Sequence, residues 1–335
     1  MDAILVMLKP PGMTSHDLVA IARQHLRQRR VGHTGTLDPG AAGVLVLCLG
    51  SATRLVPYME EHLKHYRGEL WLGRSTDTQD VSGKVLQEDR AFCLTDKDLE
   101  RAFVAFQGES EQTPPMVSAL RHRGKRLYEL ARQGKIVERA PRPINICELS
   151  PVGNWTKRNW HFGDTIRFDV VCSKGTYIRT LCHDIGDYLG VPAHMSFLLR
   201  TQAGPWSLQD ALTLEEFIEI AQTEQPRLMG NDVSHLPGFF SMDHGLRHLA
   251  GAVLGIEAAN RVRNGARVRA EQIEHFLKPG STRIKLAKSD GVEEPRGLLR
   301  VYDAQNGFFG IGRGQRLSGA WELQPVRLLP LESGK

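Results

Sequence analysis

Between residues 166 and 189 the hydrophobic pattern changes its period within a few positions, and this change limits the folds open to the chain. Every second residue from 166 to 172 is apolar, as in a half-buried strand. After Ser173-Lys174-Gly175, apolar residues recur at helical spacing up to Gly190, which is a typical helix C-cap. Elsewhere strand-like and helix-like segments follow one another without a regular βαβ rhythm. We therefore expect an α+β protein and not a doubly wound sheet.

Other segments of the first two thirds give the same mixture. Strands are expected over 4–8, 66–72 and 84–88, with a polar turn at 77–83 between the last two. Thr14 and Asp17 have the spacing of a capping box at the start of a helix. A second helix is expected over 95–107, and a third over 211–223.

The composition changes after this third helix. Residues 224–245 are rich in Pro, Gly, Asn and Asp and are typical of a linker or of an irregular join between domains. Beyond them, strand-like runs at 298–302 and 308–311 flank Gln305-Asn306-Gly307, a strong hairpin signal. We therefore expect two domains, at 1–235 and 240–330, the second of them small and all-β.

The composition also excludes several classes of protein. The chain has 335 residues, 41% of them hydrophobic, and five scattered cysteines without a C-x-x-C pair, which argues against a disulfide framework or a zinc site. No run approaches the ~20 apolar residues that cross a bilayer, and residues 1–8 are too short for a signal sequence. These features predict a cytoplasmic protein that does not bind or cross a membrane. Its net charge of +5 favours a polyanionic partner.

Residues 32–45 contain the carboxylate that is the strongest candidate for a catalytic group. Asp38 lies among glycines and small residues, directly before the apolar run 44–49. Glycines let a large ligand approach the backbone closely, and Pro39 biases Asp38 toward an extended conformation. A turn without a function is the alternative interpretation of Asp-Pro-Gly. Walker A loops, G-x-S-x-G elbows and His spacings typical of metal sites are absent from the sequence, so neither a cofactor nor a metal is expected.

Five sequence blocks between residues 4 and 215 resemble, in the same order, the motifs of one protein family. Its catalytic motif is similar to His33-Thr34-Gly35-Thr36-Leu37-Asp38-Pro39, and further blocks match 9–17, 64–80, 172–181 and 198–201. The chain thus resembles the TruB family of tRNA pseudouridine synthases. The resemblance implies a mixed, mostly antiparallel sheet flanked by helices, followed by a small PUA-like β-barrel. Arg261-Val262-Arg263-Asn264-Gly265 would be the opening strand and turn of that barrel.

The resemblance also implies roles for individual residues. Asp38 would be the nucleophile, and Arg179 would pair with it, since a guanidinium favours an ionised carboxylate. The remaining roles concern the target base: Tyr66 would stack on it, His33 would fill the space that it leaves on flipping, and Tyr177 and Leu198 would line its pocket. The chain departs from the family's usual residues at Val117 and Leu199.

A basic segment at about 114–142 corresponds to the family's thumb insertion, which clamps RNA. Its apolar residues at 127, 128, 130 and 131 indicate an amphipathic segment and not a charged tail. The expected phosphate contacts are Arg121, Arg123, Lys125, Arg126, Arg132 and, outside the segment, Lys174.

The sequence therefore predicts an isomerase that converts uridine-55 in the T-loop of tRNA to pseudouridine. The target uridine would be flipped out of the loop before Asp38 reaches it. We expect a monomer that binds the T-arm and needs no protein partner. Two alternatives remain open: a guide-RNA-dependent pseudouridine synthase, and a non-catalytic chaperone that helps tRNA to fold.

Overall fold

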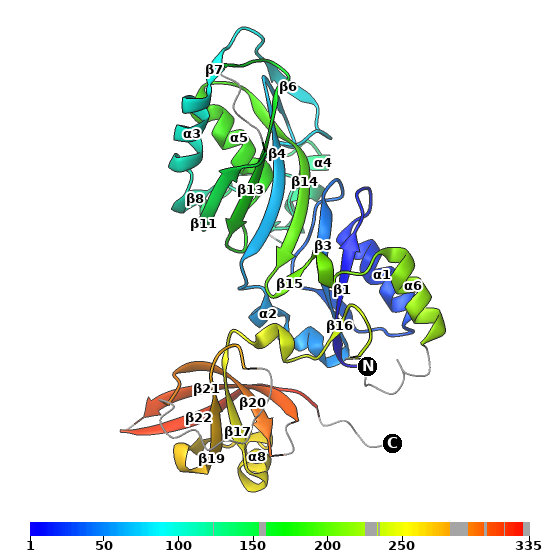
Figure 1. The fold of residues 1–335 in the computed structure, drawn as a ribbon, viewed down its shortest axis with the longest axis vertical. Coiled ribbons are helices and arrows are strands. Elements are labelled where there is room, and N and C mark those ends of the chain that lie inside the picture. Colours follow the sequence, from blue (N-terminus) through cyan, green and yellow to red (C-terminus); the bar gives the residue numbers. More distant parts are fainter. Residues whose placement is uncertain are drawn as a thin grey trace.

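The computed structural model describes residues 1–122, 124–153, 159–224, 233, 235–281, 294–304, 307–317 and 319–330. Its largest element is a ten-stranded sheet that runs through the upper two thirds of the molecule (Figure 1). The path through the sheet is β16 (Phe239–Phe240), β1 (Ala3–Lys9), β3 (Ala42–Leu49), β14 (Ala193–Ala203), β4 (Lys64–Leu72), β13 (Thr165–Cys172), β11 (Arg142–Pro151) and β8 (Gly108–Gln112). Two short strands join beside this path: β2 (Val31–His33) on β3, and β15 (Trp206–Ser207) on β14.

Almost all the pairings in this sheet are antiparallel. The exception is the contact of β14 with β3, where Leu199 lies opposite Ala42 and Arg200 opposite Gly43 in parallel. An added Cβ at Gly43 would lie 2.2 Å from the Arg200 carbonyl oxygen, so only glycine allows this approach. The mixed, mostly antiparallel sheet confirms the predicted α+β class.

Two pairs of helices cover different parts of the sheet. The helices α1 (Ser15–His25) and α6 (Leu214–Thr223) pack beside β1, while α3 (Asp96–Ala105) and α5 (Ile178–Leu189) lie beside β13 and β11 (Figure 1). The predicted capping box is present, since Thr14 Oγ1 accepts from the Asp17 amide and Asp17 Oδ2 from the Thr14 amide. The predicted glycine C-cap is also present, since Gly190 ends α5 in the left-handed conformation with φ +70°.

The two strands expected at 66–72 and 84–88 are both present, and a third strand lies between them in the sequence. The expected strands at 66–72 and 84–88 do not pair with each other, because β4 is taken up by β13 and β14. Instead a short extra strand, β5 (Arg74–Thr76), forms the hairpin with β6 (Val85–Glu88). Gly73, with φ +96°, separates β4 from β5 and lets the chain leave the large sheet. The polar turn 77–83 is therefore held by β5 and β6.

The basic segment is an insertion between two neighbouring strands of the sheet, β8 and β11. It carries the short hairpin β9 (Arg121–His122) and β10 (Lys125–Arg126), followed by α4 (Leu127–Arg132). Leu127 and Leu130 are buried, which agrees with an amphipathic segment. A further two-residue pairing joins β7 (Leu94–Thr95) to β12 (Asn159–Trp160) beside α3.

The C-terminal part forms a separate six-stranded sheet, in the order β18-β22-β21-β20-β17-β19 (Figure 1). Its strands are β17 (Ala250–Leu254), β18 (Val268–Arg269), β19 (Ile273–Leu277), β20 (Gly297–Asp303), β21 (Phe308–Leu317) and β22 (Ala320–Leu328). The hairpin of β20 and β21 is confirmed, although Gln305 and Asn306 of its turn lie outside the described residues.

Two predictions for this part are wrong. It is not all-β, and residues 261–265 are not its opening strand, because Arg261, Val262 and Arg263 end the helix α8 (Ile256–Arg263). Ala258, Ala259 and Val262 lie on one face of that helix and pack into the core of the small sheet. This burial outweighs the strand-like alternation of Arg261-Val262-Arg263.

Residues 225–232 and 234 of the segment expected at 224–245 lie outside the described residues, and the rest of it from Phe239 onward packs against both sheets. Phe239 and Phe240 form β16, which adds to the edge of the large sheet by pairing with β1. Beyond it, Leu246 packs into one apolar cluster together with Ile4 of the large sheet and Ile311 of the small one. The two sheets therefore share a hydrophobic core. No helix in the described ranges is long and apolar enough to cross a membrane.

Candidate active site

Asp38 lies in the loop between β2 and β3, and two contacts fix this loop. The hydroxyl of Ser15, in the first turn of α1, donates to the Leu37 carbonyl at 3.2 Å and accepts from the Leu37 amide at 2.9 Å. On the other side, Nζ of Lys9 donates to the Pro39 carbonyl at 3.2 Å. The Ala41 amide bonds back to the Asp38 carbonyl, which closes a turn. The Asp38 side chain is thus presented from an anchored turn and remains a third exposed.

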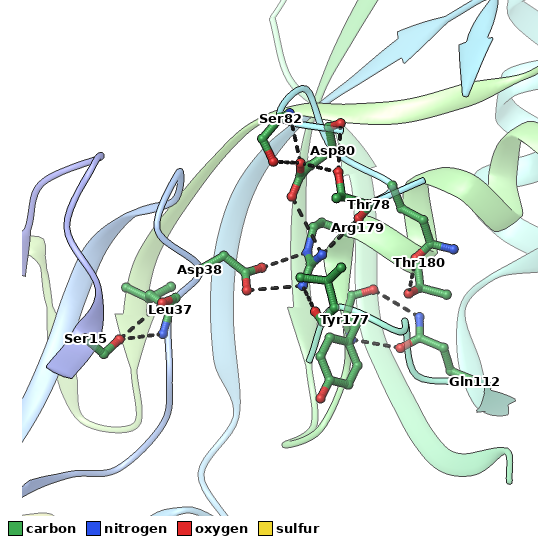
Figure 2. Close-up of polar contacts among 12 residues, drawn as sticks. Ser15, Leu37, Asp38, Thr78, Asp80, Ser82, Gln112, Tyr177, Arg179 and Thr180 are labelled. Atoms are coloured by element: carbon green, nitrogen blue, oxygen red, sulfur yellow. Dashed lines mark hydrogen bonds and ion pairs between the residues drawn. The ribbon is translucent and has the colours of Figure 1, made fainter. Parts of the chain in front are cut away.

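Arg179, in the first turn of α5, meets Asp38 across 141 positions of sequence (Figure 2). Its Nε donates to Oδ2 of Asp38 at 2.8 Å and its Nη2 to Oδ1 at 3.1 Å, a bidentate pair. Nη1 donates to the Thr78 carbonyl and Nη2 to the Val117 carbonyl, both at 2.9 Å. Only 2% of the Arg179 side chain is exposed. The guanidinium is therefore a fixed, desolvated cation that orients the carboxylate of Asp38.

A second carboxylate, Asp80, completes the surroundings of Arg179. Its Oδ2 lies 3.7 Å from Nη1 of Arg179, while its Oδ1 accepts from the Thr78 hydroxyl at 2.7 Å and the Ser82 amide at 2.9 Å. Figure 2 shows Asp38 and Asp80 approaching the guanidinium from different sides. Because Asp80 is tied to its own turn, it supports Arg179 without competing for the face that holds Asp38.

A cleft of about 1080 Å³ opens in front of Asp38. One wall comes from the loop that carries Asp38 and from the start of α1, including His33, Leu37 and His16, and another comes from the basic segment, from Met116 to Ile136. Such a volume suits a nucleotide-sized ligand. The cleft therefore combines a partly exposed carboxylate with a wall that carries the cationic residues Arg126 and Lys135.

The predicted base-binding residues occupy three different positions. His33 lines the cleft, and burial lowers its pKa, so its imidazole is neutral at pH 7. Tyr66 on β4 and Leu198 on β14 are buried and belong to the same packed cluster as Leu37. Tyr66 lies directly opposite Arg200, and Leu198 opposite Gly68, so both point to one face of the sheet. Neither is among the residues that line the cleft; burial raises the pKa of Tyr66, so its phenol is neutral.

Tyr177 directly precedes α5 and is held by its backbone. Its amide donates to Oε1 of Gln112 at 2.8 Å, and its carbonyl accepts from Nε2 of the same side chain at 3.1 Å (Figure 2). Burial raises the pKa of Tyr177. The paired contact with Gln112 fixes the start of α5 and, with it, the position of Arg179.

Two family models match the chain and meet inside this site. The model described as the TruB family pseudouridylate synthase N-terminal domain matches residues 23–178, and the tRNA pseudouridylate synthase B C-terminal domain matches 179–236. The chain belongs to the TruB family. Asp38 lies in the first matched region and Arg179 begins the second.

Curated relatives in the TruB family are similar over most of their length. The tRNA pseudouridine synthase B of Alkaliphilus oremlandii is 43% identical over 80% of this chain and 83% of its own. That of Symbiobacterium thermophilum is 52% identical over 64% of this chain and 71% of its own.

Solved structures agree with the fold. An H/ACA RNP bound to a substrate RNA containing 2'-deoxyuridine holds a chain with TM-score 0.70 and 22% identity, matched over 99% of this chain and 86% of that one. A chain of a Cbf5-Nop10-Gar1 complex has TM-score 0.69 and 23% identity, over 97% and 84%. These neighbours establish the pseudouridine synthase fold for this TruB-family chain.

Three buried cations beside the loop were not singled out from the sequence. Lys9 and Arg200 are at most 2% exposed, and Lys64 is 9% exposed. Arg200 donates from Nε to the Val44 carbonyl at 2.7 Å, and Nζ of Lys64 donates to two backbone carbonyls at 2.9 Å. Burial lowers the pKa of Lys9 and of Lys64 to about 8. The only sequence signal for them was their place inside TruB-family blocks, since charged residues are otherwise expected at the surface.

The predicted RNA contacts are only partly brought to the cleft. Arg126 is exposed and lines it, as does Lys135, whereas Lys125 is exposed on the same hairpin. Lys174 is exposed and forms an ion pair with Glu61. Arg123 and the side chains of Arg121 and Arg132 lie outside the described part of the structure.

One group of side chains has donor atoms close enough to hold a metal ion among the described residues. It consists of His183, Asp184 and Asp187 on α5. None of the three lines the cleft.

Proposed function

We propose that this TruB-family chain converts uridine-55 in the T-loop of tRNA to pseudouridine, without a guide RNA. The observation that carries the proposal is the bidentate contact of Arg179 with Asp38 at the side of an open cleft. The relatives are named tRNA pseudouridine synthase B, which supports tRNA as the substrate.

In this proposal Asp38 attacks as an ionised carboxylate, a recognised form of covalent catalysis. Asp38 forms a bond to the nucleotide, and the bond between N1 and C1′ of the sugar breaks. The uracil then turns, C5 bonds to C1′ and the bond to Asp38 breaks again. The proton on C5 is removed, and N1 gains a proton. Substrate and product are isomers, so the reaction needs neither oxidant nor reductant. Arg179 supplies a positive charge that stays in place while the carboxylate forms and breaks its bond.

Other side chains would hold the flipped base. Tyr66 and Leu198 share one face of the sheet next to Leu37, where a neutral phenol offers an aromatic surface for stacking. Its hydroxyl would pass on the C5 proton by accepting it while releasing its own proton. His33 would enter the space that the base leaves, and Tyr177 would complete the pocket. RNA has to displace or reshape part of the cleft wall to reach Tyr66 and Leu198.

We further propose that the chain works as a cytoplasmic monomer with a catalytic domain at 1–235 and an RNA-binding PUA-like domain at 240–330. The basic insertion at about 114–142 would clamp the T-arm. Arg126, Lys125, Arg121, Arg123, Arg132 and Lys174 would contact phosphates and make binding sensitive to salt.

Tritium release tests the proposal directly. Purified protein is mixed with an unmodified tRNA transcript that carries [5-³H]uridine, without any added guide. We expect release of at least one equivalent, and its loss in Asp38→Ala with tRNA binding largely intact. Asp169→Ala is a matched control, because Asp169 makes a bidentate pair with Arg67 at 2.8 Å on the exposed sheet face. Tight binding without release would point instead to a guide-dependent enzyme or a tRNA chaperone.

A further inference from the structure

Three consecutive residues of the 77–83 turn each contact one of two consecutive residues of α5. The Thr78 carbonyl and the Asp80 carboxylate both approach Nη1 of Arg179, at 2.9 and 3.7 Å. The residue between them, Gln79, accepts a hydrogen bond at Oε1 from the hydroxyl of Thr180 at 2.8 Å (Figure 2). Arg179 holds Asp38, whereas its neighbour Thr180 holds the turn. The turn and the helix are thus joined at adjacent positions.

Gln79 has an unusual backbone conformation for its residue type. Its φ is +64°, and among the described residues only Arg27 shares a positive φ without being glycine. The left-handed region is unfavourable for a residue with a side chain, and such a residue persists where its surroundings hold it. Here the Gln79 amide donates to the Thr76 carbonyl at 3.1 Å, and its carbonyl accepts from the Met195 amide of β14 at 3.1 Å. Side chain and backbone therefore tie Gln79 to α5, to β14 and to its own turn.

This conformation determines which way the neighbouring groups point. A left-handed residue reverses the direction of the chain, so the carbonyl before it and the side chain after it can face the same partner. At this turn the shared partner is Arg179, which receives Thr78 from one side of Gln79 and Asp80 from the other. Loss of the left-handed conformation would turn one of these groups away from the guanidinium.

The hydroxyl of Thr180 supports this conformation from the helix. A threonine within a helix commonly donates to a carbonyl of its own preceding turn. Thr180, which is 3% exposed, donates instead to Gln79 on a different segment. Neither Thr180 nor Gln79 lines the cleft, so neither is placed to touch a substrate.

We propose that Gln79 and Thr180 are positioning residues that hold Arg179 in the orientation in which it binds Asp38. The activity readout for this proposal rests on the proposed function. The structural readout does not, because it reports on the contact of Arg179 with Asp38 in the free protein.

Thr180→Val tests the proposal because valine has nearly the shape of threonine and lacks the hydroxyl. We expect the single-turnover rate at saturating protein to fall about tenfold, while the Kd for tRNA changes less than twofold. Thr180→Ser keeps the hydroxyl and should restore the rate to within twofold of the original chain. Thr53→Val is the matched control, since the Thr53 hydroxyl donates to the Gly50 carbonyl at 2.7 Å outside the cleft.

Substitutions of Gln79 separate its backbone from its side chain. Gln79→Gly adopts a φ of +64° without strain but lacks Oε1, so it should lose as much rate as Thr180→Val. Gln79→Val loses Oε1 and also disfavours the left-handed region, so its loss should be several-fold greater. Equal rates for the glycine and valine variants would contradict the role given to the backbone.

Hydrogen exchange of the Arg179 Nε–H group measures the contact without turnover. In nuclear magnetic resonance spectra its signal is assigned by its absence in Arg179→Lys. We expect slow exchange in the original chain and in Thr180→Ser, and exchange at least tenfold faster in Thr180→Val. Unchanged exchange in Thr180→Val would overturn the proposal, whether or not the chain releases tritium. Tritium release that is absent from the original chain would refute the proposed function alone.

Discussion

Arg179→Lys is the substitution whose effect can be worked out in most detail. Arginine makes four hydrogen bonds here, two to the carboxylate of Asp38 and two to the carbonyls of Thr78 and Val117. Lysine keeps the positive charge but cannot form the planar, bidentate contact. The substitution therefore removes the orientation of Asp38 while it leaves the charge balance of the site unchanged.

The size of the effect follows from the lost contacts. A hydrogen bond to a charged group contributes about 1.5–3 kcal/mol, and the substitution removes at least one such bond to Asp38 and disturbs a second. If roughly 2–4 kcal/mol of transition-state stabilisation is lost, the single-turnover rate falls roughly 30- to 1000-fold. The Kd for tRNA should change less than threefold, because Arg179 is buried behind Asp38.

The assay is single-turnover tritium release, with tRNA binding measured separately on filters. Arg67→Lys is the control, because Arg67 makes the same bidentate contact with Asp169 while its side chain is 45% exposed. That variant should lose less than twofold in rate, as exposed ion pairs contribute little. A loss below threefold in Arg179→Lys, or an equal loss in both variants, would refute the reasoning.

Three further predictions concern other parts of the molecule. His62 and His248 share a hydrogen bond of 2.9 Å, and burial lowers the pKa of His62 to about 4 and also lowers the pKa of His248. The neutral pair therefore stabilises the fold fully well above pH 6.5 and progressively less as the pH falls toward 4. Between pH 7.5 and pH 5, the free energy of unfolding measured in urea should fall by about 1 kcal/mol more in the original chain than in His62→Gln. Arg126→Ala should weaken tRNA binding and reduce the slope of log Kd against log salt by about 1, whereas the slope would be unchanged if Arg126 made no phosphate contact. Gly43→Ala places a Cβ 2.2 Å from a backbone oxygen at φ +119° and should lower the free energy of unfolding by more than about 3 kcal/mol. The added Cβ of the control Gly40→Ala meets nothing within 4 Å, so this variant should change the free energy of unfolding by less than about 1 kcal/mol.

Local signals in the sequence predicted the elements that depend on local contacts. The capping box of Thr14 and Asp17 and the glycine that ends α5 are encoded within a few residues, and both are present. The strand β16 was not predicted, because two phenylalanines become a strand only by pairing with β1, more than 230 positions earlier. The helix α8 was missed for a related reason, since its apolar face is defined by the sheet that it covers.

The candidate site shows the same limit. The pairing of Arg179 with Asp38 was expected from a family resemblance and not from periodicity or composition, which carry no information on a contact over 141 positions. Lys9 and Arg200 were overlooked because charged residue types predict exposure. Only the folded chain brings backbone carbonyls together around them.

The apolar cluster shared by the two sheets holds the N-terminal and C-terminal parts of the molecule at a set separation and orientation. Trp206 and Ile4 on one side and Ile311 and Leu329 on the other lie in the same cluster, so rotation between the parts would expose them to water. If both parts bind RNA as proposed, an RNA that contacts both has to offer its two contact surfaces at the separation that the protein already has. Exchanging the C-terminal part with that of a relative would require these core residues to be exchanged with it.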